Sequence, residues 1–125
     1  MDFAGPLGID AFVYRAADGS VKLKPVVEIN PRYTMGRVLV ELMAQVAQGT
    51  SGVFRLVNAA QLRAAGVENF LTYAKMIADK FPLQVEGEII PRIRDGALCL
   101  NDPAHAQVCL ATFQAGRSLS ALLEI

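Results

Sequence analysis

The first third of the chain is predicted to form a β-hairpin, and this hairpin is the feature that most constrains the fold. Two segments rich in β-branched and aromatic residues, Gly8–Arg15 (GIDAFVYR) and Val21–Asn30 (VKLKPVVEIN), flank the turn-forming sequence AADGS. We expect Asp18-Gly19-Ser20 to form the loop, because glycine adopts the positive φ that a short loop needs. Pro25 has no amide hydrogen to donate, so it predicts an edge position or a bulge in the second strand.

Helical and strand patterns alternate along the rest of the chain. Apolar residues at helical spacing predict a helix over about 35–48, and a second helix is expected between a capping Asn58 and Gly66. A third helix is predicted over about 68–80, ended by Pro82. Further strands are expected over residues 53–57, 83–90, 92–94, 97–101 and 107–113, and a short helix over about 118–124.

Turn signals separate the later strands. Asp95-Gly96 predicts a type I′ turn, and the loop Asp102–Ala106 is expected to join the last two strands. Pairing across this loop places Cys99 opposite Cys109, an arrangement that suits two buried thiols, a disulfide or a redox pair; buried thiols are the ordinary role of free cysteine. His105 lies in the same loop without a Ser, Cys or carboxylate at the spacing of a catalytic motif.

These elements predict one α/β domain, α+β in arrangement, with an antiparallel sheet and packed helices over residues 1–125. A chain of 125 residues has the length of one ordinary domain. Apolar residues make up 53% of the chain, which is enough to form a buried core.

Composition excludes several classes of function. Twelve basic residues balance twelve acidic ones, whereas a nucleic-acid-binding protein needs a basic surface. The most apolar stretch, Val38–Ala47, is interrupted by Glu41 and Gln45 and falls short of the ~20 apolar residues of a membrane span. The first residues, MDFAGPLGID, lack the pattern of a secretory signal, and two cysteines are too few for a disulfide scaffold. We therefore expect a cytoplasmic protein.

Two acidic residues and an amide in the hairpin form the most informative pattern in the sequence. Glu28 and Asn30 are two residues apart, so their side chains leave the same face of the strand. The expected loop places Asp10 directly opposite Glu28 on that face. Facing carboxylates repel each other, but a divalent cation between them reverses the sign of the interaction. Two carboxylates and an amide carbonyl are hard oxygen ligands that suit Mg²⁺.

Arg32 follows directly after this strand, where its guanidinium group is placed to grip a phosphate with two hydrogen bonds. The alternative is an ordinary solvated hairpin face, in which Lys22, Lys24 or Arg15 pairs with the two carboxylates. The spacing of the residues alone does not decide between these interpretations.

The order of the motifs favours the metal site. GPLGID, then the hairpin, then VVEINPR resembles the C-terminal end of the nucleotide-binding fold of the ATP-grasp superfamily, where a strand carboxylate precedes a Glu-x-Asn-x-Arg motif. The resemblance covers about residues 5–40. It assigns residues 1–48 to the Mg²⁺- and phosphate-binding portion of that fold and residues 49–125 to a family-specific continuation.

The resemblance implies a role for each residue of the motif. Asp10 would ligate one Mg²⁺ or Mn²⁺ ion, Glu28 would bridge two ions, and Asn30 would hold the second. Arg32 would act as the catalytic residue by contacting the terminal phosphate of ATP or the acyl phosphate. The segment that follows would contact the acyl acceptor or its phosphate through Thr34 and Arg37.

Local physics gives Thr34 and Arg37 a second reason to bind an anion. If Thr34 caps the helix, the Arg37 cation lies in the first turn, where it opposes the helix dipole. A bound phosphate or carboxylate would remove this conflict, and the helix amides suit such an anion. The alternative is an exposed arginine that reaches into water.

The resemblance implies that the chain belongs to an ATP-dependent ligase that activates a small carboxylate substrate as an acyl phosphate and transfers it to an amine or a thiol. ATP-grasp sites also use a lobe that holds adenine, and only nine residues precede Asp10. The chain is therefore expected to be the C-terminal portion of such an enzyme, or a truncated relative of it, without turnover alone.

Two other interpretations remain open from the sequence. The first is a non-catalytic binding or assembly domain derived from the ATP-grasp fold, with a homodimer covering the apolar surface that a missing lobe would expose. The second is an unrelated α/β domain in which EINPR occurs by chance.

Overall fold

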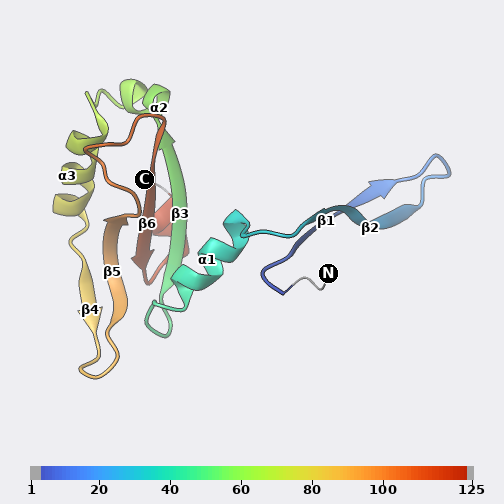
Figure 1. Ribbon diagram of the computed structural model, residues 1–125, viewed down its shortest axis with the longest axis horizontal. Helices are drawn as coiled ribbons and strands as arrows, with labels where there is room; N and C mark the ends of the chain where they lie inside the picture. The colour runs from blue at the N-terminus through green and yellow to red at the C-terminus, as the bar shows by residue number, and fades with distance from the viewer. Residues whose placement is uncertain (1–3, 124–125) are drawn as a thin grey trace. The chain divides into compact units, whose positions relative to one another are not determined.

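A computed structural model of the chain describes residues 4–123 and confirms the α+β class. The chain divides into two compact units, Met1–Glu41 and Leu42–Ile125. One antiparallel sheet of two strands lies in the first unit and one of four strands in the second (Figure 1).

The first unit contains a hairpin and most of a helix: β1 (Gly8–Arg15), β2 (Val21–Asn30) and the start of α1 (Met35–Met43). Both strands have the bounds that the sequence predicts. In the second unit the elements are β3 (Ser51–Asn58), α2 (Ala59–Ala64), α3 (Phe70–Lys80), β4 (Gln84–Glu86), β5 (Arg92–Cys99), β6 (Cys109–Gly116) and α4 (Leu119–Leu123).

The loop of the hairpin differs from the expected one by a single residue. The Gly19 amide donates to the Ala16 carbonyl (2.9 Å), and the Ala16 amide donates to the Ser20 carbonyl (2.8 Å). The loop is therefore Ala17-Asp18-Gly19, with Gly19 at a φ of 82°. The expected loop, Asp18-Gly19-Ser20, was wrong because the type I turn begins one residue earlier.

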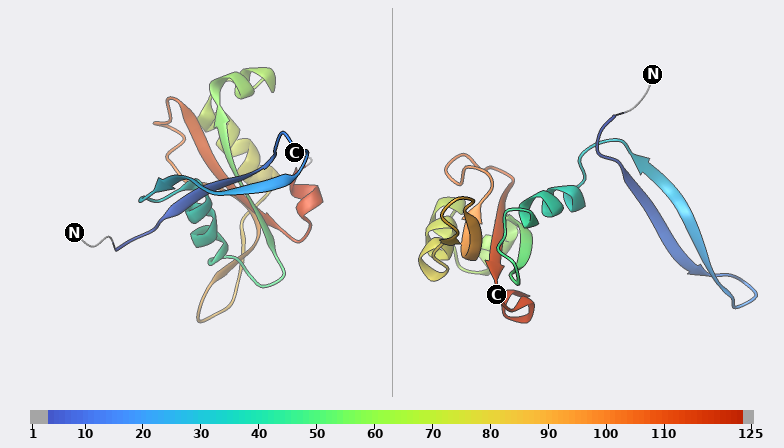
Figure 2. Two further views of the ribbon diagram at one scale, coloured as in Figure 1. Left: turned by 90° about the vertical axis from the view of Figure 1, so that its right-hand side faces the viewer. Right: turned by 90° about the horizontal axis from the view of Figure 1, so that it is seen from below.

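A bulge in β2 compensates for this difference. Near the loop, Phe12 pairs with Lys24, but Asp10 pairs with Glu28, so Ala11 faces the three residues 25–27. Pro25 lies in this bulge, as its missing amide hydrogen predicts. The bulge restores the register at the open end of the hairpin, which is the twisted ribbon in Figure 2.

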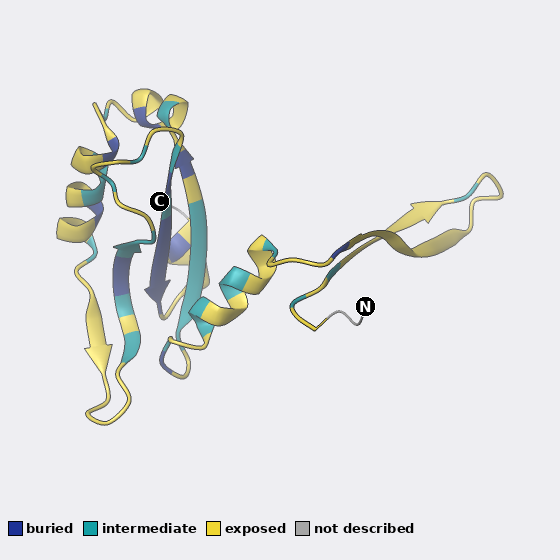
Figure 3. Ribbon diagram, viewed as in Figure 1, coloured by how far each residue is buried: buried dark blue, intermediate teal, exposed yellow. Residues whose placement is uncertain are grey.

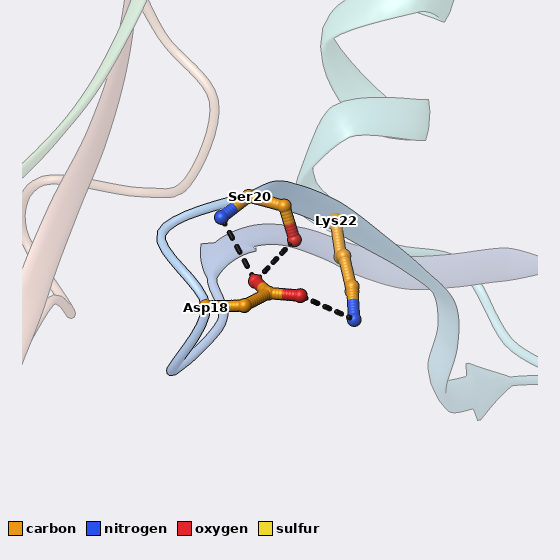
Figure 4. A network of polar contacts seen from close by, with 3 residues as sticks. All are labelled: Asp18, Ser20 and Lys22. Atoms are coloured by element: carbon orange, nitrogen blue, oxygen red, sulfur yellow. Dashed lines mark hydrogen bonds and ion pairs between the residues drawn. The ribbon is translucent and has the colours of Figure 1, made fainter.

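Asp18 organises the tip of the hairpin (Figure 4). Its carboxylate accepts hydrogen bonds from the amide (2.9 Å) and the hydroxyl of Ser20, and it lies 3.7 Å from the Lys22 ammonium. The hydrogen bond from the Ser20 hydroxyl is the main reason that the pKa of Asp18 lies below its usual value.

The four strands of the second unit follow the order β3-β6-β5-β4. β6 is central and runs antiparallel to both β3 and β5. One face packs against α2 and α3 through a core of Val57, Leu62, Phe70 and Leu110. On the opposite face Phe113 is fully buried, and Figure 3 shows burial concentrated along β5 and β6.

The structure confirms the predicted cap of α2 at Asn58 and shows a cap of α3 at Asn69 that the sequence analysis did not predict. Asn58 forms a capping box with Gln61, and the Asn69 side chain accepts a hydrogen bond from the Thr72 amide (2.9 Å).

The helix expected over 35–48 ends at Met43. Beyond it, the Ile93 amide donates to the Gln45 carbonyl (2.9 Å), and the Ala47 amide donates to the Ile93 carbonyl (2.8 Å). Backbone hydrogen bonds to β5 thus replace the last turn of the helix.

The turn expected at Asp95-Gly96 is absent, because β5 continues through both residues and the chain reverses at residues 87–91. Gly96 has a φ of 107° and lies against the backbone of the β4 segment. A Cβ atom at Gly96 would lie 2.5 Å from the Pro82 carbonyl oxygen and 2.6 Å from the Leu83 Cα atom. Glycine is needed here for a close backbone approach, not for a turn.

The expected pairing of the two cysteines is also wrong. Cys99 lies opposite Thr112, and Cys109 lies opposite Asn58. The Asn101 side chain stabilises this offset. Its Nδ2 atom donates to the Cys109 carbonyl (3.1 Å), and its Oδ1 atom accepts from the Ala111 amide (2.8 Å), so the connection between β5 and β6 is longer than the expected five-residue loop. Both thiols are free, and burial raises the pKa of the Cys99 thiol.

The short final helix, α4, is present, and the expected end at Glu124 lies outside the described residues. Within residues 4–123, no helix combines the length and apolarity that crossing a membrane requires.

Substitution of Gly96 tests the close backbone approach. Gly66 is the matched control, because it has a φ of 70° but open space around its Cα atom. Gly66→Ala should cost about 1–2 kcal/mol of unfolding free energy from backbone strain alone. Gly96→Ala should cost at least about 2 kcal/mol more, because backbone atoms must move as well. Urea denaturation measures both, and equal costs would contradict the packing described for Gly96.

The pKa of Asp18 tests the structure of the hairpin tip. Because this pKa is lowered on folding, the carboxylate stabilises the turn fully above the unfolded value of 3.8 and loses this effect as the pH falls through the folded pKa. Ser20→Ala should raise the pKa of Asp18 toward 3.8. Lys22→Ala should raise it less, because the Lys22 contribution is smaller. An NMR titration of the carboxyl carbon that finds no change in Ser20→Ala would rule out this turn.

Candidate metal and phosphate site

The open end of the hairpin brings the predicted metal ligands together. Asp10 lies directly opposite Glu28, as expected, and the next pair on the same face is Gly8 with Asn30. The bulge at residues 25–27 makes this possible, because without it Asp10 would face Val26. The backbone therefore places two carboxylates and an amide on one face of a short ribbon.

Asn30 connects the two ends of the site. Its side-chain nitrogen donates to Asp10 Oδ2 at 3.4 Å, and its Oδ1 accepts from Arg32 Nη2 at 3.2 Å. Asn30 is the one buried residue of β1 and β2, with 9% of its surface exposed. Buried amides need hydrogen-bond partners, and Asn30 finds both of its partners among the predicted site residues.

The cations of the solvated-face interpretation, Lys22, Lys24 and Arg15, form no ion pair with either carboxylate within residues 4–123. Lys22 pairs with Asp18, and Arg15 donates to the Gly19 carbonyl at 3.0 Å. Across residues 4–123, neither Asp10 nor Glu28 forms an ion pair. The salt bridges of the solvated-face interpretation are thus not formed, and two negative charges face each other.

The donor set fits a hard divalent cation. Mg²⁺ takes oxygen ligands and keeps several of its waters, so Asp10, Glu28 and one amide oxygen are enough to hold it. Asn30 Oδ1 accepts from Arg32, so the amide must rotate to turn this oxygen toward the carboxylates. No group of three or more His, Cys, Asp or Glu side chains that could hold a metal occurs in the described part of the chain, which makes the amide essential to such a site.

Arg32 lies beside the carboxylate pair and is exposed to solvent. Its amide donates to the Asn30 carbonyl (2.8 Å), and its guanidinium contacts Asn30 and the Tyr33 carbonyl (3.4 Å). These neutral partners leave the charge of the guanidinium unpaired within the region that the structure describes. An anion bound next to Asp10 and Glu28 would be close to this side chain, because Arg32 contacts Asn30 and Asn30 contacts Asp10.

Thr34 is held against the base of the hairpin. A Cβ atom at Gly8 would lie 2.6 Å from the Thr34 methyl carbon, so the glycine makes room for this threonine. Thr34 Oγ1 accepts from the Arg37 amide at 3.3 Å, which confirms Thr34 as the helix cap. The sequence predicted no role for Gly8, although this glycine belongs to the segment GPLGID that carries the resemblance.

Arg37 has a different partner from the one that the sequence suggests. Its guanidinium forms an ion pair with Glu41, one turn further along α1. This pair compensates for the cation near the helix N-terminus without a bound anion. The structure thus places Asp10, Glu28, Asn30, Arg32 and Thr34 together and directs Arg37 to its own helix.

His105 pairs with Asp102 at 2.6 Å, and this contact lowers the pKa of the Asp102 carboxyl. Both side chains are exposed in the loop between β5 and β6. The sequence analysis missed this carboxylate partner, which connects two residues of the loop.

Comparisons with protein-family models, with curated proteins and with solved structures each found no match for this chain.

Proposed function

We propose that this chain is the metal- and phosphate-binding C-terminal portion of an ATP-grasp ligase. Such an enzyme is Mg²⁺- and ATP-dependent, activates a small carboxylate as an acyl phosphate and transfers it to an amine or a thiol. The observation that carries this proposal is the register of the hairpin, which pairs Asp10 with Glu28 beside Asn30 and Arg32.

The side chains divide the work of such a site between binding and charge neutralisation. Asp10, Glu28 and Asn30 would hold Mg²⁺ or Mn²⁺, which supplies positive charge next to the phosphates of ATP. Arg32 would pair with an oxygen of the transferring phosphoryl group and stabilise the charge that develops there. Thr34 would position the start of α1 beside this group.

The adenine-binding lobe would come from residues outside this sequence, so we infer that the chain has no turnover alone. A cytoplasmic setting fits this chemistry, and the free thiols of Cys99 and Cys109 suit a reducing compartment.

A non-catalytic assembly domain is the second candidate, and the other face of the hairpin favours it. Five large apolar side chains on that face are 54–64% exposed: Ile9, Val13, Val21, Leu23 and Ile29. A two-stranded ribbon is marginally stable alone, so this face needs a partner surface. A second copy of the chain would provide one.

Paramagnetic broadening by Mn²⁺ tests the metal site. Titration of the chain should broaden the NMR signals of Asp10, Glu28 and Asn30 first. Glu28→Gln should weaken binding by at least about tenfold, because it removes a charged ligand. Glu88→Gln removes the same charge from the loop between β4 and β5 and should leave binding unchanged. Broadening spread evenly over acidic residues, or none at millimolar Mn²⁺, would contradict the proposed site.

Light scattering during size-exclusion chromatography tests the assembly candidate. If two copies pack through the apolar face, the average mass should rise toward twice 13.5 kDa with concentration. Leu23→Gln should shift the protein to monomer, whereas Lys24→Gln, on the opposite face, should not. A wild-type monomer at every concentration would eliminate this candidate.

A further inference from the structure

We propose that the second unit contains a binding site for a small monocarboxylate with an apolar body, anchored by Arg55. The site is a cavity of about 360 Å³ between α2, α3 and β3. The cavity is lined by residues from the range 55–81 and by none from the hairpin. The test of this proposal is therefore independent of the ligase proposal.

The walls of the cavity are apolar. They come from β3, from both helices and from the residue after α3, and consist mainly of Val57, Leu62, Ala65, Met76, Ile77 and Phe81. Ligand pockets in proteins combine such walls with a few polar groups that fix the orientation of the ligand.

Arg55 supplies the charged group. It alternates with Val57 along β3 and therefore projects to the helix-covered face of the sheet. Its Nη1 atom donates to Gln114 Oε1 at 3.2 Å, and its Nη2 atom donates to the Leu122 carbonyl. Both partners are neutral, and in the described range 4–123 no carboxylate pairs with this guanidinium.

The two charged side chains that line the cavity, Arg55 and Lys80, are both cations. Lys80 is a second cation in the lining, with its ammonium 5.2 Å from the centre of the Phe81 ring, and no Asp or Glu lines the cavity. A cationic, acid-free and apolar cavity favours an anion over a neutral or cationic ligand.

Two buried polar side chains next to the cavity contact or adjoin Arg55. Gln114 and Thr112 are buried, with 6% and 5% exposure, and share with Arg55 a further hollow of about 20 Å³. Such a hollow holds about one water molecule, not a ligand. Gln114 is therefore a positioning residue that orients the guanidinium.

The number of free donors selects the anion. A guanidinium group has five N–H donors, and two are already used, so Arg55 can still grip one carboxylate. The main cavity, at about 360 Å³, lies within the size range of small-molecule pockets and suits a short aliphatic or aromatic acid. We therefore choose hexanoate as the probe.

NMR titration of the whole chain with hexanoate, hexanamide and acetate tests the proposal. Hexanoate should shift the signals of Tyr73, Met76 and Ile77 and bind at least about tenfold more tightly than its neutral amide. Acetate should bind more weakly than hexanoate, because it lacks the apolar body.

Variants identify the anchor. Arg55→Met should weaken hexanoate binding by about tenfold or more, with little effect on hexanamide. Arg63→Met removes an arginine of α2 that does not line this cavity and should change neither affinity. Equal binding of hexanoate and hexanamide to the wild-type protein would overturn the proposal, and so would the absence of shifts at these residues. This comparison decides the matter even if Arg55→Met does not fold.

Discussion

The repulsion between Asp10 and Glu28 is the constraint on which the interpretation of this protein depends. Facing carboxylates destabilise a hairpin, and no ion pair to either side chain offsets this effect within residues 4–123. The fold nevertheless uses a bulge around Pro25 to bring the two carboxylates opposite each other. A local arrangement that opposes stability at a polar cluster is typical of a binding site.

Local patterns predicted much of the fold. The two hairpin strands, the cap at Asn58 and the bulge at Pro25 each follow from residues that act on their own neighbours. The Asp10–Glu28 register was also predicted, but through two compensating differences: the loop lies one residue earlier, and the bulge restores the pairing. The candidate site could therefore be predicted from residue types and approximate spacing.

Contacts between distant segments could not be read from the sequence. The end of α1 depends on hydrogen bonds to Ile93, and the Asp-Gly pair at 95–96 lies in a strand because the backbone near Leu83 packs against Gly96. From the sequence alone, Arg55 has the pattern of an ordinary strand arginine. The structure places Gln114, from a strand about sixty residues later, within hydrogen-bond distance of it. Periodicity carries no information about such neighbours.

The pairing of the hairpin strands decides the central claim. Cross-strand nuclear Overhauser effects between backbone protons report this register directly. The structure predicts contacts of Asp10 with Glu28 and of Phe12 with Lys24, which only a bulge at residues 25–27 allows. Contacts of Asp10 with Val26 would show a hairpin without the bulge, in which the carboxylates do not meet and no metal site forms.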